Sequence, residues 1–141
     1  MRRAIAAAVV ALLSVSQAQA ANHYAALVGK YGFDVVSDQG VRSQLPKKDA
    51  DALSAHIAVS GPSTLVDGRF LVAKGCAPHS CTVAEGLVVA DTETGAVYGL
   101  YTDDGKRGVR ETSRAAWDRA VGPSLPRGVR EAVAAWKTNL S

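Results

Sequence analysis

The chain reads TLVDGRFLVAK over residues 64–74, which sets an Asp-Gly pair between two apolar runs. Asp67-Gly68 is the strongest short signal for a tight β-hairpin, because both central positions of such a turn require a positive φ. The stretch therefore predicts two antiparallel strands, Thr64 to Val66 and Arg69 to Lys74, joined by this turn.

Three further strands are expected downstream, each separated from the next by a short connection. Turn residues stand between them at Thr92-Glu93-Thr94-Gly95 and at Asp103-Asp104-Gly105. The expected strands are Val83 to Ala90, Ala96 to Thr102 and Arg107 to Thr112. Together with the first hairpin they predict a five-stranded antiparallel meander.

Helical patterns precede this block of strands. Asn22 and Asp49 are each expected to cap a helix, and Gly32 is expected to end the first one. One face of each has residues at helical spacing: Tyr24, Leu27, Val28 and Tyr31 in the first, then Ala52, Leu53, His56 and Ile57 in the second. The stretch from Phe33 to Leu45 carries no pattern clear enough to assign.

Helical patterns also follow the strands. Ser113 can cap a short helix that runs through Val121, and Gly122-Pro123 is expected to end it. Pro126 fits the first turn of a last helix. The apolar stripe of that helix is Val129, Val133, Trp136 and Leu140. Helices on either side of a block of strands predict a single-domain α+β fold, with the helices packed on one face of the sheet.

Residues 1–20 have the features of a secretory signal peptide. Arg2 and Arg3 precede an apolar run from Ala4 to Val15, and Ala18-Gln19-Ala20 supplies a cleavage pattern of small residues. Cleavage there leaves residues 21–141 as one domain, expected in the periplasm or outside the cell. A retained N-terminal anchor is the alternative. No other apolar run approaches membrane length, so no membrane association is expected after cleavage.

Composition argues against several classes of function. The formal net charge is +3, and two of the basic residues lie in the expected leader. No cluster of Lys and Arg with interleaved aromatic residues is present, so a nucleic-acid partner is not expected. No Gly-rich phosphate loop follows an expected strand, and no cofactor is expected. The sequence leaves the oligomeric state open, with a homodimer as one option.

The connection between the second and third expected strands reads GCAPHSCT over residues 75–82 and holds both cysteines of the chain. In an exported protein an even pair of cysteines most simply forms a disulfide. A Cys76–Cys81 bond would make the residues between bulge outward, with Pro78 restricting the backbone that presents His79. Cys76, His79 and Cys81 could instead bind a metal, although their spacing matches no common zinc pattern.

An imidazole displayed on a stiff loop suits a cleft lined by carboxylates. Glycosidase active sites carry two carboxyl groups that flank the scissile bond, one of them a general acid. A protonated imidazole donates hydrogen bonds from both nitrogens, and a neutral one donates and accepts. His79 can therefore bind between such carboxyls and take the place of the sugar.

The loop resembles that of the Ivy-type inhibitors of vertebrate lysozyme, which has the form Cys-Lys-Pro-His-Asp-Cys. The positions that match in register are Cys76, Pro78, His79 and Cys81. The resemblance implies an antiparallel sheet with helices alongside and a Cys76–Cys81 disulfide in the loop. It also implies that His79 enters the cleft of a c-type lysozyme, and that the protein is an inhibitor rather than an enzyme.

Two loop positions depart from the family's form, because Ala77 replaces its Lys and Ser80 replaces its Asp. The first change removes a positive charge, and the second removes a carboxylate that could orient the histidine. Affinity and target are therefore open, and the cell's own lytic transglycosylases, whose clefts resemble that of lysozyme, are an alternative partner. Two other functions remain: a periplasmic structural or cell-wall-binding module, and an enzyme that uses Cys76 and His79 as a nucleophile pair.

Overall fold

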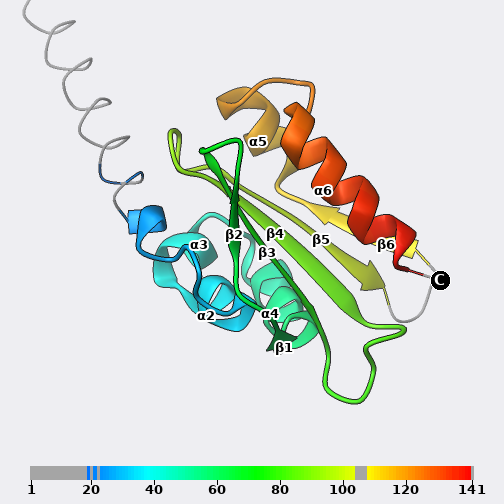
Figure 1. The fold of residues 1–141 in the computed structure, drawn as a ribbon. Helices are drawn as coiled ribbons and strands as arrows, with labels where there is room; N and C mark the ends of the chain where they lie inside the picture. Colours follow the sequence, from blue (N-terminus) through cyan, green and yellow to red (C-terminus); the bar gives the residue numbers. More distant parts are fainter. Residues whose placement is uncertain (1–18, 20, 22, 104–107, 141) are drawn as a thin grey trace, which may run out of the picture.

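A computed structural model describes residues 19, 21, 23–103 and 108–140. Three of the predictions therefore lie wholly or mostly outside the described residues. They are the signal peptide, of which only residue 19 is described, the cap at Asn22, and the Asp103-Asp104-Gly105 turn, of which only Asp103 is described. The fold is a single α+β domain in three layers (Figure 1). One antiparallel sheet lies between an N-terminal group of helices and a C-terminal pair.

The predicted meander is confirmed. Its strands are β2 (Thr64–Val66), β3 (Phe70–Cys76), β4 (Glu85–Asp91), β5 (Val97–Asp103) and β6 (Gly108–Thr112). Each strand pairs antiparallel with the next along the chain. The Asp-Gly turn has the predicted backbone, with φ 54° at Asp67 and 62° at Gly68.

A short strand that the sequence did not predict extends the edge of the sheet. This strand, β1 (Val59–Ser60), pairs with Gly75 and Cys76 of β3, while β2 pairs with the opposite half of β3. Gly61 and Pro62 stand between β1 and β2, and proline cannot donate to a strand ladder. The edge is therefore split into two short pieces, too short to show a strand pattern in the sequence.

The N-terminal helices are α2 (Gly32–Ser37), α3 (Gln39–Ser43) and α4 (Lys47–His56). The first expected helix is only partly confirmed, because residues 23–25 are helical but turns occupy residues 26–29. Gly32 does not end a helix as expected, since α2 begins there. Gly32 is buried, and a Cβ at this position would lie 2.9 Å from Ile57 Cγ2 and 3.0 Å from the Lys74 carbonyl oxygen. The glycine thus permits close packing against β3 and α4 rather than a left-handed helix end.

The expected cap at Asp49 is also wrong. Pro46 occupies the N-cap of α4, and Asp49 lies inside the first turn with its carboxylate buried. It accepts hydrogen bonds from Tyr101 Oη at 2.6 Å and Thr112 Oγ1 at 2.7 Å. Burial raises the pKa of Asp49, but these two bonds and nearby basic side chains hold the pKa below its usual 3.8. Asp49 thus ties α4 to β5 and β6.

The C-terminal helices are α5 (Arg114–Ala120) and α6 (Arg127–Thr138). Ser113 precedes α5, but it has φ 62° and its hydroxyl makes no cap hydrogen bond. Pro126 lies at the N-cap of α6, one position before the expected first turn. The apolar stripe of α6 is confirmed, since Val129, Val133 and Trp136 are buried and Leu140 is partly buried.

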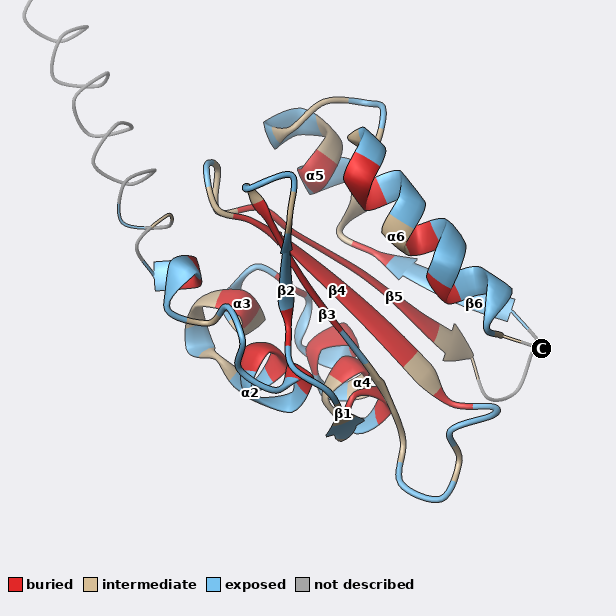
Figure 2. Ribbon diagram, in the orientation of Figure 1, coloured by how far each residue is buried: buried red, intermediate tan, exposed pale blue. Residues whose placement is uncertain are grey.

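The helices cover both faces of the sheet, so the expectation of one covered face is wrong. Figure 2 shows β4 buried along most of its length between the two helical layers. One core joins α2, α3 and α4 to Leu71, Ala73, Val88 and Ala90. The other joins α5 and α6 to Phe70, Val72, Leu87 and Val89. The unbroken apolar run Leu87 to Ala90 is the sequence signal of a strand buried on both faces.

An ion pair between the buried carboxylate of Asp91 and the partly exposed Arg69 fixes the end of the β3–β4 hairpin that lies farthest from its cysteines. The side chain of Asp91 is 0% exposed and accepts bonds from Arg69 Nε at 2.7 Å and Nη2 at 2.8 Å. Thr94 Oγ1 and the Glu93 backbone N–H donate to the same carboxylate.

In the described part of the chain, no helix is both long and apolar enough to cross a bilayer.

Candidate functional site

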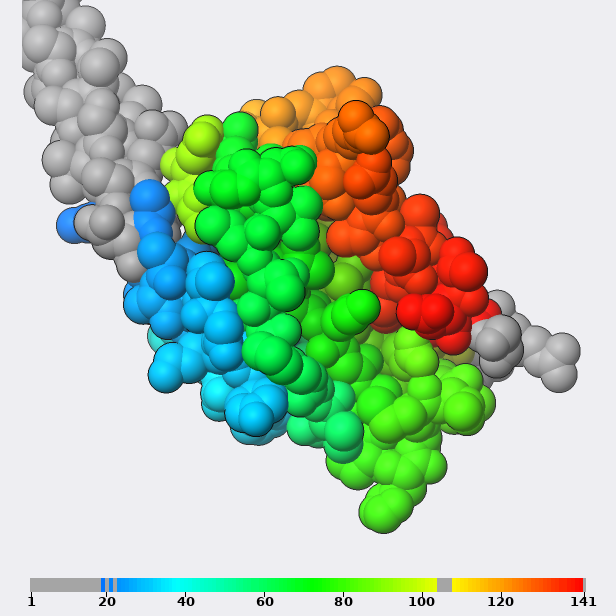
Figure 3. All heavy atoms as spheres, in the orientation of Figure 1, coloured from blue at the N-terminus to red at the C-terminus, as the bar shows by residue number. Residues whose placement is uncertain are grey.

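The connection between β3 and β4 projects beyond the end of the sheet as a long loop (Figure 1). It spans residues 77–84 and stands out from the rest of the surface in Figure 3. Cys76, the last residue of β3, forms a disulfide with Cys81, and their Cα atoms are 4.8 Å apart. The structure therefore brings all the predicted loop residues, Cys76, Ala77, Pro78, His79, Ser80 and Cys81, into one closed ring.

The first half of the loop is a tight turn that presents His79. The Ser80 backbone N–H donates to the Ala77 carbonyl at 3.1 Å, which closes a four-residue turn with Pro78 and His79 in the middle. Proline first and a positive φ second is the pattern of a type II turn. His79 has φ 62°, a conformation that costs an L-residue about 1–2 kcal/mol and usually falls to glycine.

The second half of the loop is a single helical turn. The backbone N–H groups of Val83 and Ala84 both donate to the Ser80 carbonyl, at 3.0 and 2.8 Å. The first and last residues of the loop are joined by a hydrogen bond, in which the Ala77 N–H donates to the Ala84 carbonyl at 2.8 Å. The loop therefore holds its shape through its own hydrogen bonds as well as through the disulfide.

His79 is exposed, and no described residue forms a hydrogen bond with its ring. Both ring nitrogens are thus available to a partner. Residues 77–84 contain no Asp, Glu, Lys or Arg, so the histidine carries the only ionisable side chain between the two strands besides the bonded Cys81. Glu85 is the first residue of β4. Burial raises the pKa of its carboxyl, and the positive charge of Lys74 offsets part of this rise.

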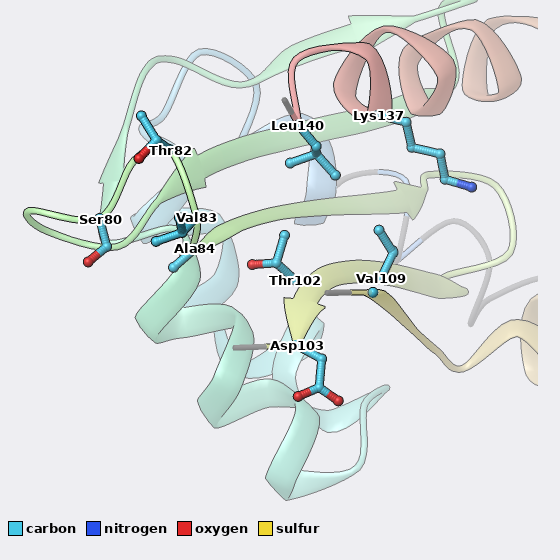
Figure 4. Close-up of a pocket in the computed structure, with 10 residues that line it drawn as sticks. Ser80, Thr82, Val83, Ala84, Thr102, Asp103, Val109, Lys137 and Leu140 are labelled. Atoms are coloured by element: carbon cyan, nitrogen blue, oxygen red, sulfur yellow. The ribbon is translucent and has the colours of Figure 1, made fainter. Parts of the chain in front are cut away.

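A hollow beside the loop was not predicted. It has a volume of about 740 Å³ and lies between the second half of the loop, the adjoining ends of β5 and β6, and the end of α6 (Figure 4). The described residues that line it are Ser80, Thr82, Val83, Ala84, Thr102, Asp103, Gly108, Val109, Lys137 and Leu140. It was missed because it joins residues far apart in sequence, and because Val83 was assigned to a strand that begins only at Glu85.

The disulfide also bears on the metal and nucleophile hypotheses. Both sulfurs are bonded to each other, so neither is a thiolate that could bind a metal or attack a substrate. In the described ranges, no three side chains among His, Cys, Asp and Glu gather as metal ligands would.

Comparison with known families agrees with the loop motif. The family model described as inhibitor of vertebrate lysozyme (Ivy) matches residues 39–139. This range contains every described strand, helices α3 to α6 and the whole loop. No curated protein and no solved structure matches the chain.

Proposed function

The chain belongs to the Ivy family of lysozyme inhibitors, and from this premise we propose that its loop blocks the active-site cleft of a c-type lysozyme. The observation that carries the proposal is His79, held with φ 62° in a turn whose flanks are joined by the Cys76–Cys81 bond. Strained backbone of this kind clusters at functional sites, because the surrounding structure must maintain it. Here the disulfide and the turn maintain it.

His79 is the residue that reaches the catalytic carboxyls. Its imidazole fits between the general acid and its partner carboxylate and hydrogen-bonds to both, so the sugar cannot enter. The protein supplies no nucleophile and activates no water, and it acts by occupying space and by neutralising the acid. Because the loop is stiff before it binds, little conformational entropy is lost on docking, which favours tight binding.

The two departures from the family's loop, Ala77 and Ser80, make this loop electrically neutral apart from His79. Rim charges chiefly raise the association rate and the salt sensitivity of a complex. We therefore expect binding to depend mainly on shape and on His79, with a weak dependence on ionic strength.

Export completes the proposal. Residues 1–20 act as a signal peptide, and residues 21–141 form the inhibitor domain in the periplasm or outside the cell. The Cys76–Cys81 disulfide supports this location, because such bonds persist in oxidising compartments. In that location the inhibitor protects the peptidoglycan of the cell that makes it.

The function is tested by the clearing of a peptidoglycan suspension by c-type lysozyme, followed as turbidity. The purified 21–141 protein should slow clearing at a near-stoichiometric ratio. The double variant Cys76→Ser/Cys81→Ser should keep the fold yet inhibit more weakly, by about 30-fold at most, because ordering the opened loop on binding costs no more than about 2 kcal/mol. Circular dichroism confirms the fold of the variant.

If the native protein has no effect on clearing at a large molar excess, lysozyme is not the target. A parallel assay with lytic transglycosylases then separates the alternatives. Inhibition there would assign the loop to the cell's own enzymes. Binding to isolated cell walls that His79→Ala leaves unchanged would identify a cell-wall-binding module.

A further inference from the structure

Val83 is a large apolar side chain placed where solvent covers most of it. It is 65% exposed, the highest value among the large exposed hydrophobic residues of the described chain. It lies on the same loop as His79, in the turn that follows. Val83 N–H and Ala84 N–H both donate to the Ser80 carbonyl, so this exposed side chain is held in a fixed position relative to His79.

The hollow beside the loop begins at Val83. Its apolar lining comes from Val83 and Ala84 on the loop, Val109 on β6 and Leu140 after α6. Charged groups come only from Asp103 and Lys137 among its described lining residues. Figure 4 shows Val83, Thr102 and Leu140 on different sides of this open space. A lining with many apolar and few charged groups suits a contact with another protein.

The hollow is continuous with the surface that the proposed function uses. Ser80 closes the turn that presents His79, and the same residue lines the hollow. A loop that enters a cleft brings the cleft walls against the flanks of the loop. With His79 at the bottom of the cleft, we therefore expect one wall to face the hollow.

We propose that Val83 is a specificity-determining residue of the inhibitor, and that the hollow receives an apolar side chain from the cleft wall of the target lysozyme. This inference rests on the proposed function. His79 recognises the catalytic carboxyls, which are common to enzymes that cleave the same bond. Val83 recognises the wall of the cleft, which differs between enzymes, and so selects among them.

The test compares the inhibition constants of Val83→Ala, Val83→Asp and the native protein on two c-type lysozymes with different cleft walls, and the variants should narrow the native preference for one of them. On the preferred enzyme, Val83→Ala should raise the constant about fivefold and Val83→Asp about 50-fold or more, because the aspartate would place a charge against an apolar wall. Both variants should fold normally, since the side chain is mostly in solvent.

Leu65 supplies the matched control. It is 42% exposed on β2 and pairs with Leu71, which lies five strand positions from Cys76, or roughly 16 Å. Leu65→Ala and Leu65→Asp should leave the inhibition constant unchanged. Equal losses at Leu65 and Val83 would indicate nonspecific apolar association and overturn the inference.

The two claims fail in different ways. If the native protein inhibits lysozyme and Val83→Asp inhibits equally well, the role of Val83 is overturned and the proposed function stands. If the native protein inhibits no lysozyme, both claims are overturned together.

Discussion

Replacing His79 with alanine is expected to weaken inhibition of c-type lysozyme by about 30- to 1,000-fold. The estimate corresponds to about 2–4 kcal/mol, the usual loss when a central, fully desolvated interface residue is truncated. The loss is large because the buried carboxyls of the enzyme would lose their partner while the rest of the loop still excludes water. Steady-state inhibition constants, measured from the clearing rate, give the effect directly.

Two controls separate the imidazole from the backbone that carries it. His79→Gly removes the ring but accepts φ 62° without strain, so it preserves the turn. It should lose as much inhibition as His79→Ala. His23 is also solvent-accessible but lies beside Asp38, away from the loop, and His23→Ala should leave inhibition intact. Retention of inhibition by His79→Gly would show that the loop backbone, and not the ring, binds the enzyme.

Replacing Asp91 with alanine is expected to lower the free energy of unfolding by about 3–5 kcal/mol. The change leaves the Arg69 guanidinium without its buried partner and removes the acceptor for Thr94 and for the Glu93 N–H. The melting temperature should fall by about 10 °C or more. Denaturant titration followed by tryptophan fluorescence measures the change, because both tryptophans are buried in the core.

Glu93→Ala is the matched control for Asp91→Ala. Glu93 lies 3.1 Å from the same arginine, but its side chain is 64% exposed, so the loss should be about 0–1 kcal/mol. Similar losses from the two variants would contradict the role given to the Arg69–Asp91 pair.

Asp91 lies at the far end of the β3–β4 hairpin from the loop. Under conditions in which Asp91→Ala is folded, its inhibition constant should therefore equal that of the native protein.

The same pair predicts how stability depends on pH. Burial raises the pKa of Asp91, but the hydrogen bonds from Arg69, Thr94 and the Glu93 N–H hold the pKa below 3.8. A carboxyl with a lowered pKa in the folded state adds stability that is complete above 3.8 and lost as pH falls below that value. Asp91→Asn should therefore be less stable near neutral pH and lose less stability between pH 5 and pH 2 than the native protein.

The strand order and the loop were predictable because each depends on neighbours in sequence. Asp67-Gly68 determines its turn by backbone preference alone, and two cysteines with Pro78 and His79 between them define the loop. The wrong predictions concern residues whose role depends on contacts with residues distant in sequence. Gly32 was predicted to end a helix, but its lack of a side chain permits close packing against Ile57 and the Lys74 carbonyl. Asp49 was predicted to cap a helix, but it accepts hydrogen bonds from Tyr101 and Thr112.

The site was predicted only in part for the same reason. His79 and the disulfide lie within six consecutive residues, so local sequence was enough to identify them. The hollow requires β5, β6 and the end of α6 to meet the loop, and no local pattern carries that information. Val83 was predicted to begin the third strand, but the loop's own hydrogen bonds to the Ser80 carbonyl hold it outside the sheet, and β4 begins at Glu85.

Competition for the cleft tests the central claim most directly. An oligosaccharide of N-acetylglucosamine occupies the substrate cleft of c-type lysozyme, and the inhibitor's affinity for the enzyme can be titrated calorimetrically at increasing oligosaccharide concentrations. If His79 and its loop fill the cleft, the apparent dissociation constant should rise in proportion to the oligosaccharide concentration above saturation. An unchanged dissociation constant, with oligosaccharide and inhibitor bound to the enzyme together, would contradict occlusion of the active site.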